Sequence, residues 1–143
     1  MTKRKKISRS IRELVAQRAK YRCEYCQCPE DFAIQAFTIE HILPRYAGGD
    51  DEISNLAWAC FGCNSAKHVK VKATDPQTGK LVVLFHPRQQ QWHQHFDWNP
   101  DSTVVVGKTQ CGRATIEALQ INRKGVVNLR RLLVKANRHP PKD

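Results

Sequence analysis

The sequence predicts a small α+β domain, in which two pairs of cysteines frame a core of strand, loop, strand and helix. Three observations carry this prediction: the chain length, two matched cysteine pairs and the order of elements between them. The chain has 143 residues, which suits one domain and leaves no room for two full cores. The cysteine pairs are Cys23-x-x-Cys26 and Cys60-x-x-Cys63. The segment between them is rich in β-branched and aromatic residues, and a helical segment follows.

The charge balance points to a polyanionic partner. The sequence carries 24 Lys and Arg against 13 Asp and Glu, a formal net charge of +11. Four zinc-bound thiolates add −4 and the ion adds +2, which leaves +9 (11 − 4 + 2). A surface this basic favours nucleic acid as the partner, and a basic surface that serves only solubility is the alternative.

Nothing in the sequence indicates export or a membrane. Residues 1–6 are basic, but no apolar segment of the kind found in a signal peptide follows them. The longest apolar run is 81–85, far short of a membrane span. We therefore expect a cytoplasmic protein without membrane partners, whose thiols stay reduced. Six cysteines in that compartment favour metal binding over disulfides.

The first expected helix follows the basic tail. Ser10-x-x-Glu13 is typical of a capping box, with Ser10 as the N-cap. An inner face at helical spacing comprises Ile7, Ile11, Leu14, Val15 and Ala19. We divide the chain into a basic tail (1–7), a core with its N-terminal helix (8–75), an extension packed on the same domain (76–137) and a tail (138–143).

Inside the core we expect one or two short strands over 32–43, a loop over 45–54, an extended segment over 55–60 and a helix over 63–72. In the extension we expect a strand over 81–85, a helix beginning at Pro87, a strand over 103–106, a helix over 112–119 and a final helix over 123–137 capped by Asn122. Trp92 and Phe96 should pack together. We interpret His93 and His95 as surface residues, and Trp58, Trp92 and Trp98 as core.

The two C-x-x-C pairs predict a tetrahedral zinc site of four thiolates, Cys23, Cys26, Cys60 and Cys63. Cys28 could replace Cys26, but the spacing of Cys26 matches that of the second pair. Cys28 and Cys111 are interpreted as small, partly buried residues. A thiol redox protein, with a cycling Cys23–Cys26 disulfide, is a competing interpretation of the same cysteines.

The sequence also resembles a known family. The matching motifs are the two cysteine pairs, Glu40-His41-Ile-x-Pro44, Gly48-Gly49, Asn55-Leu56 and Asn64-x-x-Lys67. Together they resemble an HNH endonuclease, whose fold is the ββα-metal finger. The resemblance covers about a third of the chain, with the motifs in the family's order and spacing.

The resemblance implies a role for each of these residues. His41 is the expected general base, for which an imidazole is suited because its ordinary pKa lies near the working pH. Glu40 and Asn64 are the expected ligands of one Mg²⁺ or Mn²⁺. Glu40 and His41 are adjacent on an extended segment, however, so their side chains should project to opposite sides of it. Asn55 is expected to hold the 45–54 loop.

Three further residues complete the expected site. His68, one helical turn after Asn64, is a candidate third ligand of the catalytic ion. Arg45 and Lys67 are expected to contact phosphates of the nucleic acid.

We therefore expect a bacterial or phage endonuclease that hydrolyses DNA with low sequence specificity, leaving 5′-phosphate and 3′-hydroxyl ends. One active site per chain favours nicking, and the chain could be a monomer or a homodimer. The alternative is a non-catalytic, zinc-dependent nucleic-acid-binding module.

Overall fold

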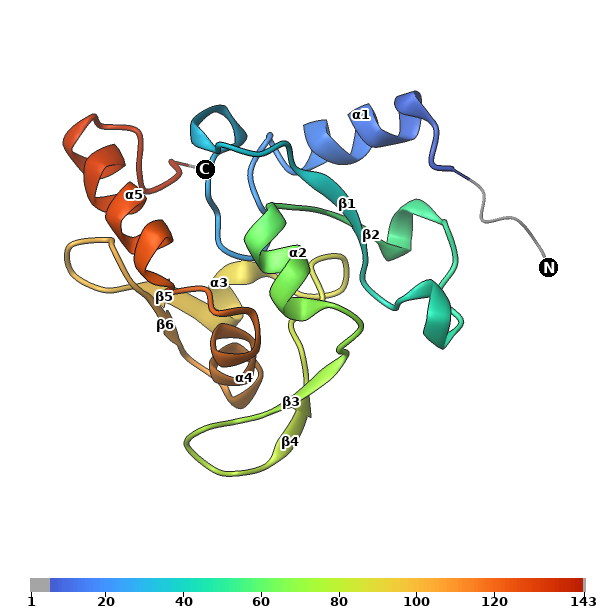
Figure 1. Ribbon diagram of the computed structural model, residues 1–143. Helices are drawn as coiled ribbons and strands as arrows, with labels where there is room; N and C mark the ends of the chain where they lie inside the picture. Colours follow the sequence, from blue (N-terminus) through green and yellow to red (C-terminus); the bar gives the residue numbers. More distant parts are fainter. Residues whose placement is uncertain (1–5, 143) are drawn as a thin grey trace.

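The computed structural model describes residues 6–142, and its centre is a ββα unit (Figure 1). Strand β1 (Thr38–His41) pairs antiparallel with β2 (Leu56–Ala59), with His41 opposite Leu56 and Thr38 opposite Ala59. Helix α2 (Phe61–Lys67) follows β2 after a single residue. All four residues of β2 are buried, as expected for a strand covered on both faces. The predicted order of strand, loop, strand and helix is confirmed.

Helix α1 (Arg9–Arg18) lies beside the β1–β2 hairpin (Figure 1). Its N-cap is Ser8 rather than the predicted Ser10, because the Ser8 hydroxyl accepts a hydrogen bond from the Ile11 amide at 3.2 Å. The buried side is centred on Val15 and Ala16, so Leu14, predicted to face inward, is 45% exposed.

Helix α2 ends earlier than predicted. It stops at Lys67, and His68 takes a positive φ of 52° that turns the chain away from the helix axis. The chain then enters β3 (Lys72–Thr74), which pairs antiparallel with β4 (Leu81–Val83), so the last residue of the predicted helix, Lys72, lies in a strand. The β-branched residues Val69 and Val71 and the available partner strand favour this outcome over a longer helix.

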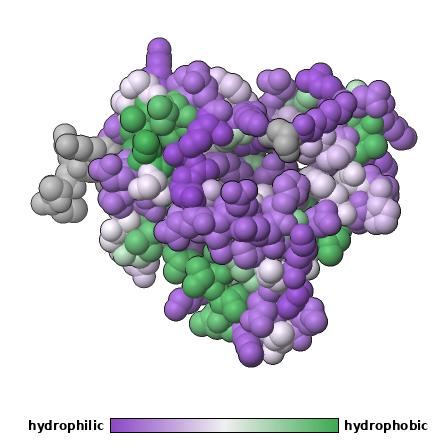
Figure 2. Space-filling model, turned by 180° about the vertical axis from the view of Figure 1, so that it is seen from behind, coloured by the Kyte–Doolittle hydropathy of each residue, from purple (hydrophilic) through white to green (hydrophobic). Residues whose placement is uncertain are grey.

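The β3–β4 hairpin projects from the molecule (Figure 1). Leu81 and Val83 are 66% and 59% exposed on it. Figure 2 shows hydrophobic surface at the lower end of the molecule, where this hairpin lies.

After β4, the extension forms a turn where a helix from Pro87 was predicted. The ring nitrogen Nδ1 of His86 accepts hydrogen bonds from the Arg88 and Gln89 amides, which fixes a turn instead. Helix α3 is confined to Trp92–His95, and the predicted packing of Trp92 on Phe96 is confirmed by a ring-centroid distance of 5.2 Å.

The remaining elements are a hairpin and two helices: β5 (Phe96–Trp98), β6 (Val105–Gly107), α4 (Gln110–Leu119) and α5 (Lys124–Lys135). Asn122 does not cap α5 as predicted. Its side chain instead accepts from the amide and donates to the carbonyl of Val105, both at 2.8 Å, so that it pairs with β6. The N-cap of α5 is Arg123.

The buried hydrophobic cluster draws on both the ββα unit and the extension. Leu56 belongs to the ββα unit, Tyr25 and Phe37 precede it in the chain, and Phe85 and Phe96 come from the extension. Trp58 is buried, and Trp92 and Trp98 pack against the cluster while partly exposed. Even the expected C-terminal tail contributes, because His139 is 6% exposed and its Nε2 lies 2.8 Å from the Ser102 carbonyl oxygen.

Candidate active site and metal centre

The four predicted cysteines meet in one buried cluster. The sulfurs of Cys23, Cys26, Cys60 and Cys63 all lie within 4.8 Å of one another. The Sγ atoms of Cys26 and Cys60 are 3.7 Å apart, and a tetrahedral zinc with about 2.3 Å bonds to sulfur would separate its ligands by about 3.8 Å. The donor set and its spacing therefore fit zinc.

Cys28 is not part of this cluster. Its thiol is 3.6 Å from the Pro29 carbonyl oxygen, and burial raises its pKa to about 11. Because its sulfur is not among the four that lie within 4.8 Å of one another, this cysteine is the poorer candidate of the two weighed from the sequence. Cys111 also lies outside the cluster and is partly exposed.

Arg123, at the start of α5, lies directly against the cluster. Its guanidinium nitrogens are 3.3 Å from Cys60 Sγ and 3.6 Å from Cys63 Sγ. Four thiolates around a divalent zinc carry a net charge of −2, so a cation at this position offsets part of that charge. The sequence offered no signal for this contact, because 60 residues separate Arg123 from Cys63.

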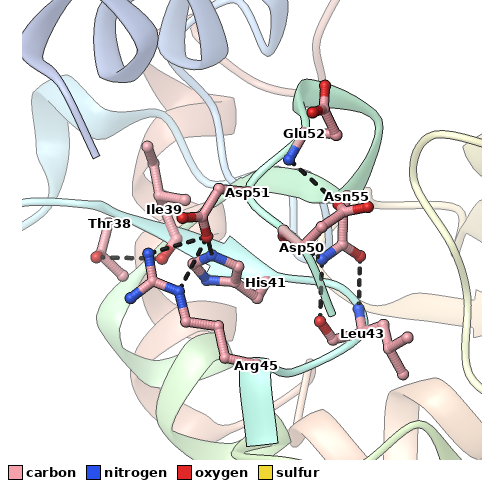
Figure 3. Close-up of polar contacts among 9 residues, drawn as sticks. All are labelled: Thr38, Ile39, His41, Leu43, Arg45, Asp50, Asp51, Glu52 and Asn55. Atoms are coloured by element: carbon pink, nitrogen blue, oxygen red, sulfur yellow. Dashed lines mark hydrogen bonds and ion pairs between the residues drawn. The ribbon is translucent and has the colours of Figure 1, made fainter. Parts of the chain in front are cut away.

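At the end of β1, His41 pairs with Asp51 from the following loop. His41 Nε2 lies 2.8 Å from Asp51 Oδ1. Arg45 also donates to Asp51 Oδ1, at 2.9 Å, so the carboxylate sits between the imidazole and the guanidinium (Figure 3). The hydrogen bond from Arg45, followed by that from His41, lowers the pKa of Asp51, which keeps the carboxylate ionised.

Asn55 ties the two ends of this loop together (Figure 3). Its Oδ1 accepts from the Leu43 amide at 2.8 Å, and its Nδ2 donates to the Leu43 and Asp50 carbonyls at 3.0 and 2.8 Å. The loop is folded so tightly that a Cβ on Gly49 would lie 1.7 Å from the Leu43 carbonyl oxygen, which explains the glycine.

Glu40 and Lys67 form a buried ion pair, which was not predicted from the sequence. Glu40 is 2% exposed; its Oε1 lies 2.5 Å from Lys67 Nζ and its Oε2 accepts from the Tyr25 hydroxyl at 2.7 Å. Lys67 is 1% exposed and also donates to the Ile42 carbonyl, so the expectation that it contacts a phosphate is wrong. A lysine at the end of a short helix is turned inward here because a buried carboxylate needs a cation. Burial raises the pKa of Glu40, and the charge of Lys67 opposes that rise.

A surface pocket of about 220 Å³ still brings the expected catalytic groups together. Its lining includes Glu40 and His41 of β1, Asn64 of α2, and His68, which follows that helix. Arg45 and Tyr46 complete the wall, and Tyr46 is 80% exposed. Within residues 6–142, the structure records no side-chain hydrogen bond for Asn64 or His68.

Comparison with known proteins agrees with this geometry. Residues 23–70 match the family model described as HNH endonuclease. Residues 23–70 are therefore similar to an HNH endonuclease, and we call this segment the HNH domain. This domain covers the zinc-type cysteine cluster, β1, β2 and α2. No curated protein and no solved structure matches the chain.

Two residues that contact the candidate site residues were not predicted from the sequence. Asp51 follows His41 by ten positions, and Tyr25 precedes Glu40 by fifteen. The Gly48-Gly49 pair indicates a loop that folds back toward β1. From that loop, a contact between β1 and the carboxylates of Asp50 or Asp51 could have been predicted. Tyr25 stands between two zinc-type cysteines, and nothing in its spacing relates it to Glu40.

None of the helices in the described part of the chain is long and apolar enough to cross a membrane.

Proposed function

We propose that this protein is a metal-dependent endonuclease that hydrolyses phosphodiester bonds of DNA. The observation that carries the proposal is the pocket in which an acid, two histidines and an asparagine converge inside an HNH domain. Cleavage of a phosphodiester needs a base for the attacking water, neutralisation of the phosphate charge and help for the leaving oxygen. The pocket offers residues for each of these tasks.

His41 acts as the general base. A carboxylate can only accept a hydrogen bond, so the contact with Asp51 places the proton of a neutral His41 on Nε2. The lone pair is then on Nδ1, where it can take a proton from water. Asp51 thus selects the tautomer of the imidazole and holds its ring in place.

Glu40, Asn64 and His68 hold the catalytic divalent ion in this proposal. A carboxylate and an amide oxygen suit Mg²⁺ or Mn²⁺, and an imidazole suits Mn²⁺. The donor set fits, because Tyr25 and Lys67 each contact one oxygen of Glu40 and leave further lone pairs on both. When bound, such an ion stabilises charge on the scissile phosphate and the leaving oxygen.

The net charge supports DNA as the substrate, and the four cysteines support zinc as a second metal. The net charge of +11 favours DNA, and Arg45 is the cation that the pocket offers to a phosphate. The four cysteines hold a structural zinc, which suits an intracellular protein with reduced thiols. A single site of this kind cuts one strand at a time and contacts mainly the backbone, so we propose nicking with low sequence specificity.

The decisive experiment compares the wild type with His41→Ala on supercoiled plasmid in the presence of Mg²⁺ or Mn²⁺. We expect the wild type to nick the plasmid, chelator to abolish nicking, and His41→Ala to reduce the rate by about 100-fold or more. His93→Ala is the matched control, because His93 is exposed on α3 and lies outside the pocket.

A non-catalytic nucleic-acid-binding module is the second candidate. The observation that favours it is the buried pairing of Glu40 with Lys67, which offsets the negative charge that a catalytic cation would need. If the wild type and His41→Ala both retard the plasmid on a gel and both leave it supercoiled, this second function is the correct one.

A further inference from the structure

A second hollow adjoins the HNH pocket on the side of α1. It lies between the start of that helix and β1, and the two depressions share Ile39, His41 and Arg45. The surface is therefore hollowed on both sides of the proposed general base. We call this second depression the α1 hollow; its other lining residues include Lys6, Ile7 and Arg12.

The α1 hollow is strongly basic. Lys6, Arg12 and Arg45 contribute three positive charges, and none of the described residues that line it is acidic. Asp51, which belongs to the neighbouring site, is paired with Arg45 and His41. That leaves the charges of Lys6 and Arg12 in excess beside the pocket. Ile7 and Ile39 provide apolar wall between the cations, suited to the face of a sugar.

Arg12 is held in place before any ligand arrives. Its guanidinium carbon lies 5.6 Å from the centre of the Trp58 ring. Trp58 is 5% exposed and stands opposite Ile39 in the β1–β2 ladder, so the ring is a fixed platform. A cation stacked on an aromatic face loses less conformational entropy on binding a phosphate than a freely rotating one does.

We propose that the α1 hollow is a phosphate-binding subsite for the DNA strand that enters the HNH pocket. Lys6 and Arg12 bind a backbone phosphate next to the one that is cleaved at His41. The strand then runs from α1, across the end of β1, toward Asn64 and His68. The inference rests on the proposed function, because it gives the position of a substrate strand relative to that site.

The test measures binding without cleavage. A fluorescein-labelled duplex and the corresponding single strand are titrated with zinc-loaded protein in the absence of added Mg²⁺ and Mn²⁺, and anisotropy is recorded over a range of salt concentrations. Arg12→Gln and Lys6→Gln should each weaken binding by at least about threefold and lower the salt slope by about one for duplex. Arg12→Lys, which keeps the charge, should recover part of the loss.

Arg131→Gln is the matched control, since this arginine lies on α5, away from α1 (Figure 1), and pairs with Asn128 on the surface. It should bind as the wild type does. Lys6→Gln guards against a folding defect in Arg12→Gln, because Lys6 precedes the helix and is exposed. The subsite is overturned if both variants keep the affinity and salt slope of Arg131→Gln while the wild type binds and nicks DNA. Absence of binding by the wild type itself would instead overturn the proposed function.

Discussion

At the residue scale, Asp51 joins two groups with different tasks. Its Oδ1 accepts from His41 Nε2 and from the guanidinium of Arg45. The carboxylate of Asp51 has two effects: it selects the tautomer of His41, and it fills space. A substitution that removes its charge but keeps its shape separates these effects. Asp51→Asn leaves an amide whose donor and acceptor can both face the imidazole, so neither ring nitrogen is favoured for the proton.

We predict that Asp51→Asn lowers the nicking rate by about tenfold or more, since the proposed base loses its fixed tautomer and orientation. Long-range ¹H–¹⁵N spectra of His41 should show the proton on Nε2 in the wild type and a mixture of tautomers in the variant. Asp50→Asn is the control, because the side chain of Asp50 accepts from the Glu52 amide and does not contact His41. A wild-type spectrum for Asp51→Asn would contradict the prediction.

The cysteines were predicted from their own spacing, and the other site residues from the family resemblance. Cys26 was chosen because its C-x-x-C spacing matches that of Cys60 and Cys63, whereas His41 and Asn64 belong to the HNH motifs. The pairing of Glu40 with Lys67 was missed, since it depends on how deeply β1 and α2 are buried against each other. A single sequence gives no measure of that depth, and an exposed role for Lys67 was the natural expectation for a lysine.

At the element scale, a glycine in the first turn of α2 leaves room for the side chain of Arg123. A Cβ on Gly62 would lie 2.4 Å from Nη2 of Arg123, so any side chain there would displace the guanidinium from the thiolates of Cys60 and Cys63. The displaced group is the end of a flexible side chain, and alanine favours a helix over glycine by about 1 kcal/mol. The fold should therefore tolerate the change.

We predict that Gly62→Ala keeps the fold but releases zinc to a chromogenic chelator about tenfold faster, a size typical of losing an outer-sphere partner. Arg123→Gln should accelerate release to a similar extent. Gly125→Ala is the control, since a Cβ on Gly125 meets nothing within 4 Å. Wild-type release rates in both Gly62→Ala and Arg123→Gln would show that Arg123 has no influence on the metal.

The element boundaries show where local sequence rules fail. The N-cap of α1 is Ser8 rather than Ser10, and a shift of two residues is the usual uncertainty of such predictions. The early end of α2 has a tertiary cause, because the residues after His68 pair with β4. The capping role predicted for Asn122 failed for the same reason, since its side chain found a partner in β6.

At the scale of the whole molecule, one buried arginine connects the HNH domain to the extension. Arg130 of α5 is 2% exposed. Its guanidinium donates to the carbonyls of Thr103 and Ile121 and to Asn122 Oδ1, each at 3.0 Å, and to the carbonyl of Cys26 at 3.3 Å. Because Cys26 belongs to the metal cluster, these bonds link the zinc-type site to three segments of the extension.

We predict that Arg130→Met destabilises the whole chain as a unit, by about 3 kcal/mol or more, because it leaves several buried acceptors without a donor. Urea unfolding of the zinc-loaded protein would be followed by tryptophan fluorescence and by zinc release. In the wild type the two transitions should coincide, and in Arg130→Met both should move together to lower urea. Arg131→Gln, next in sequence and exposed, should leave both midpoints unchanged. If fluorescence changed early in Arg130→Met while zinc release kept its wild-type midpoint, the HNH domain and the extension would be separate folding units.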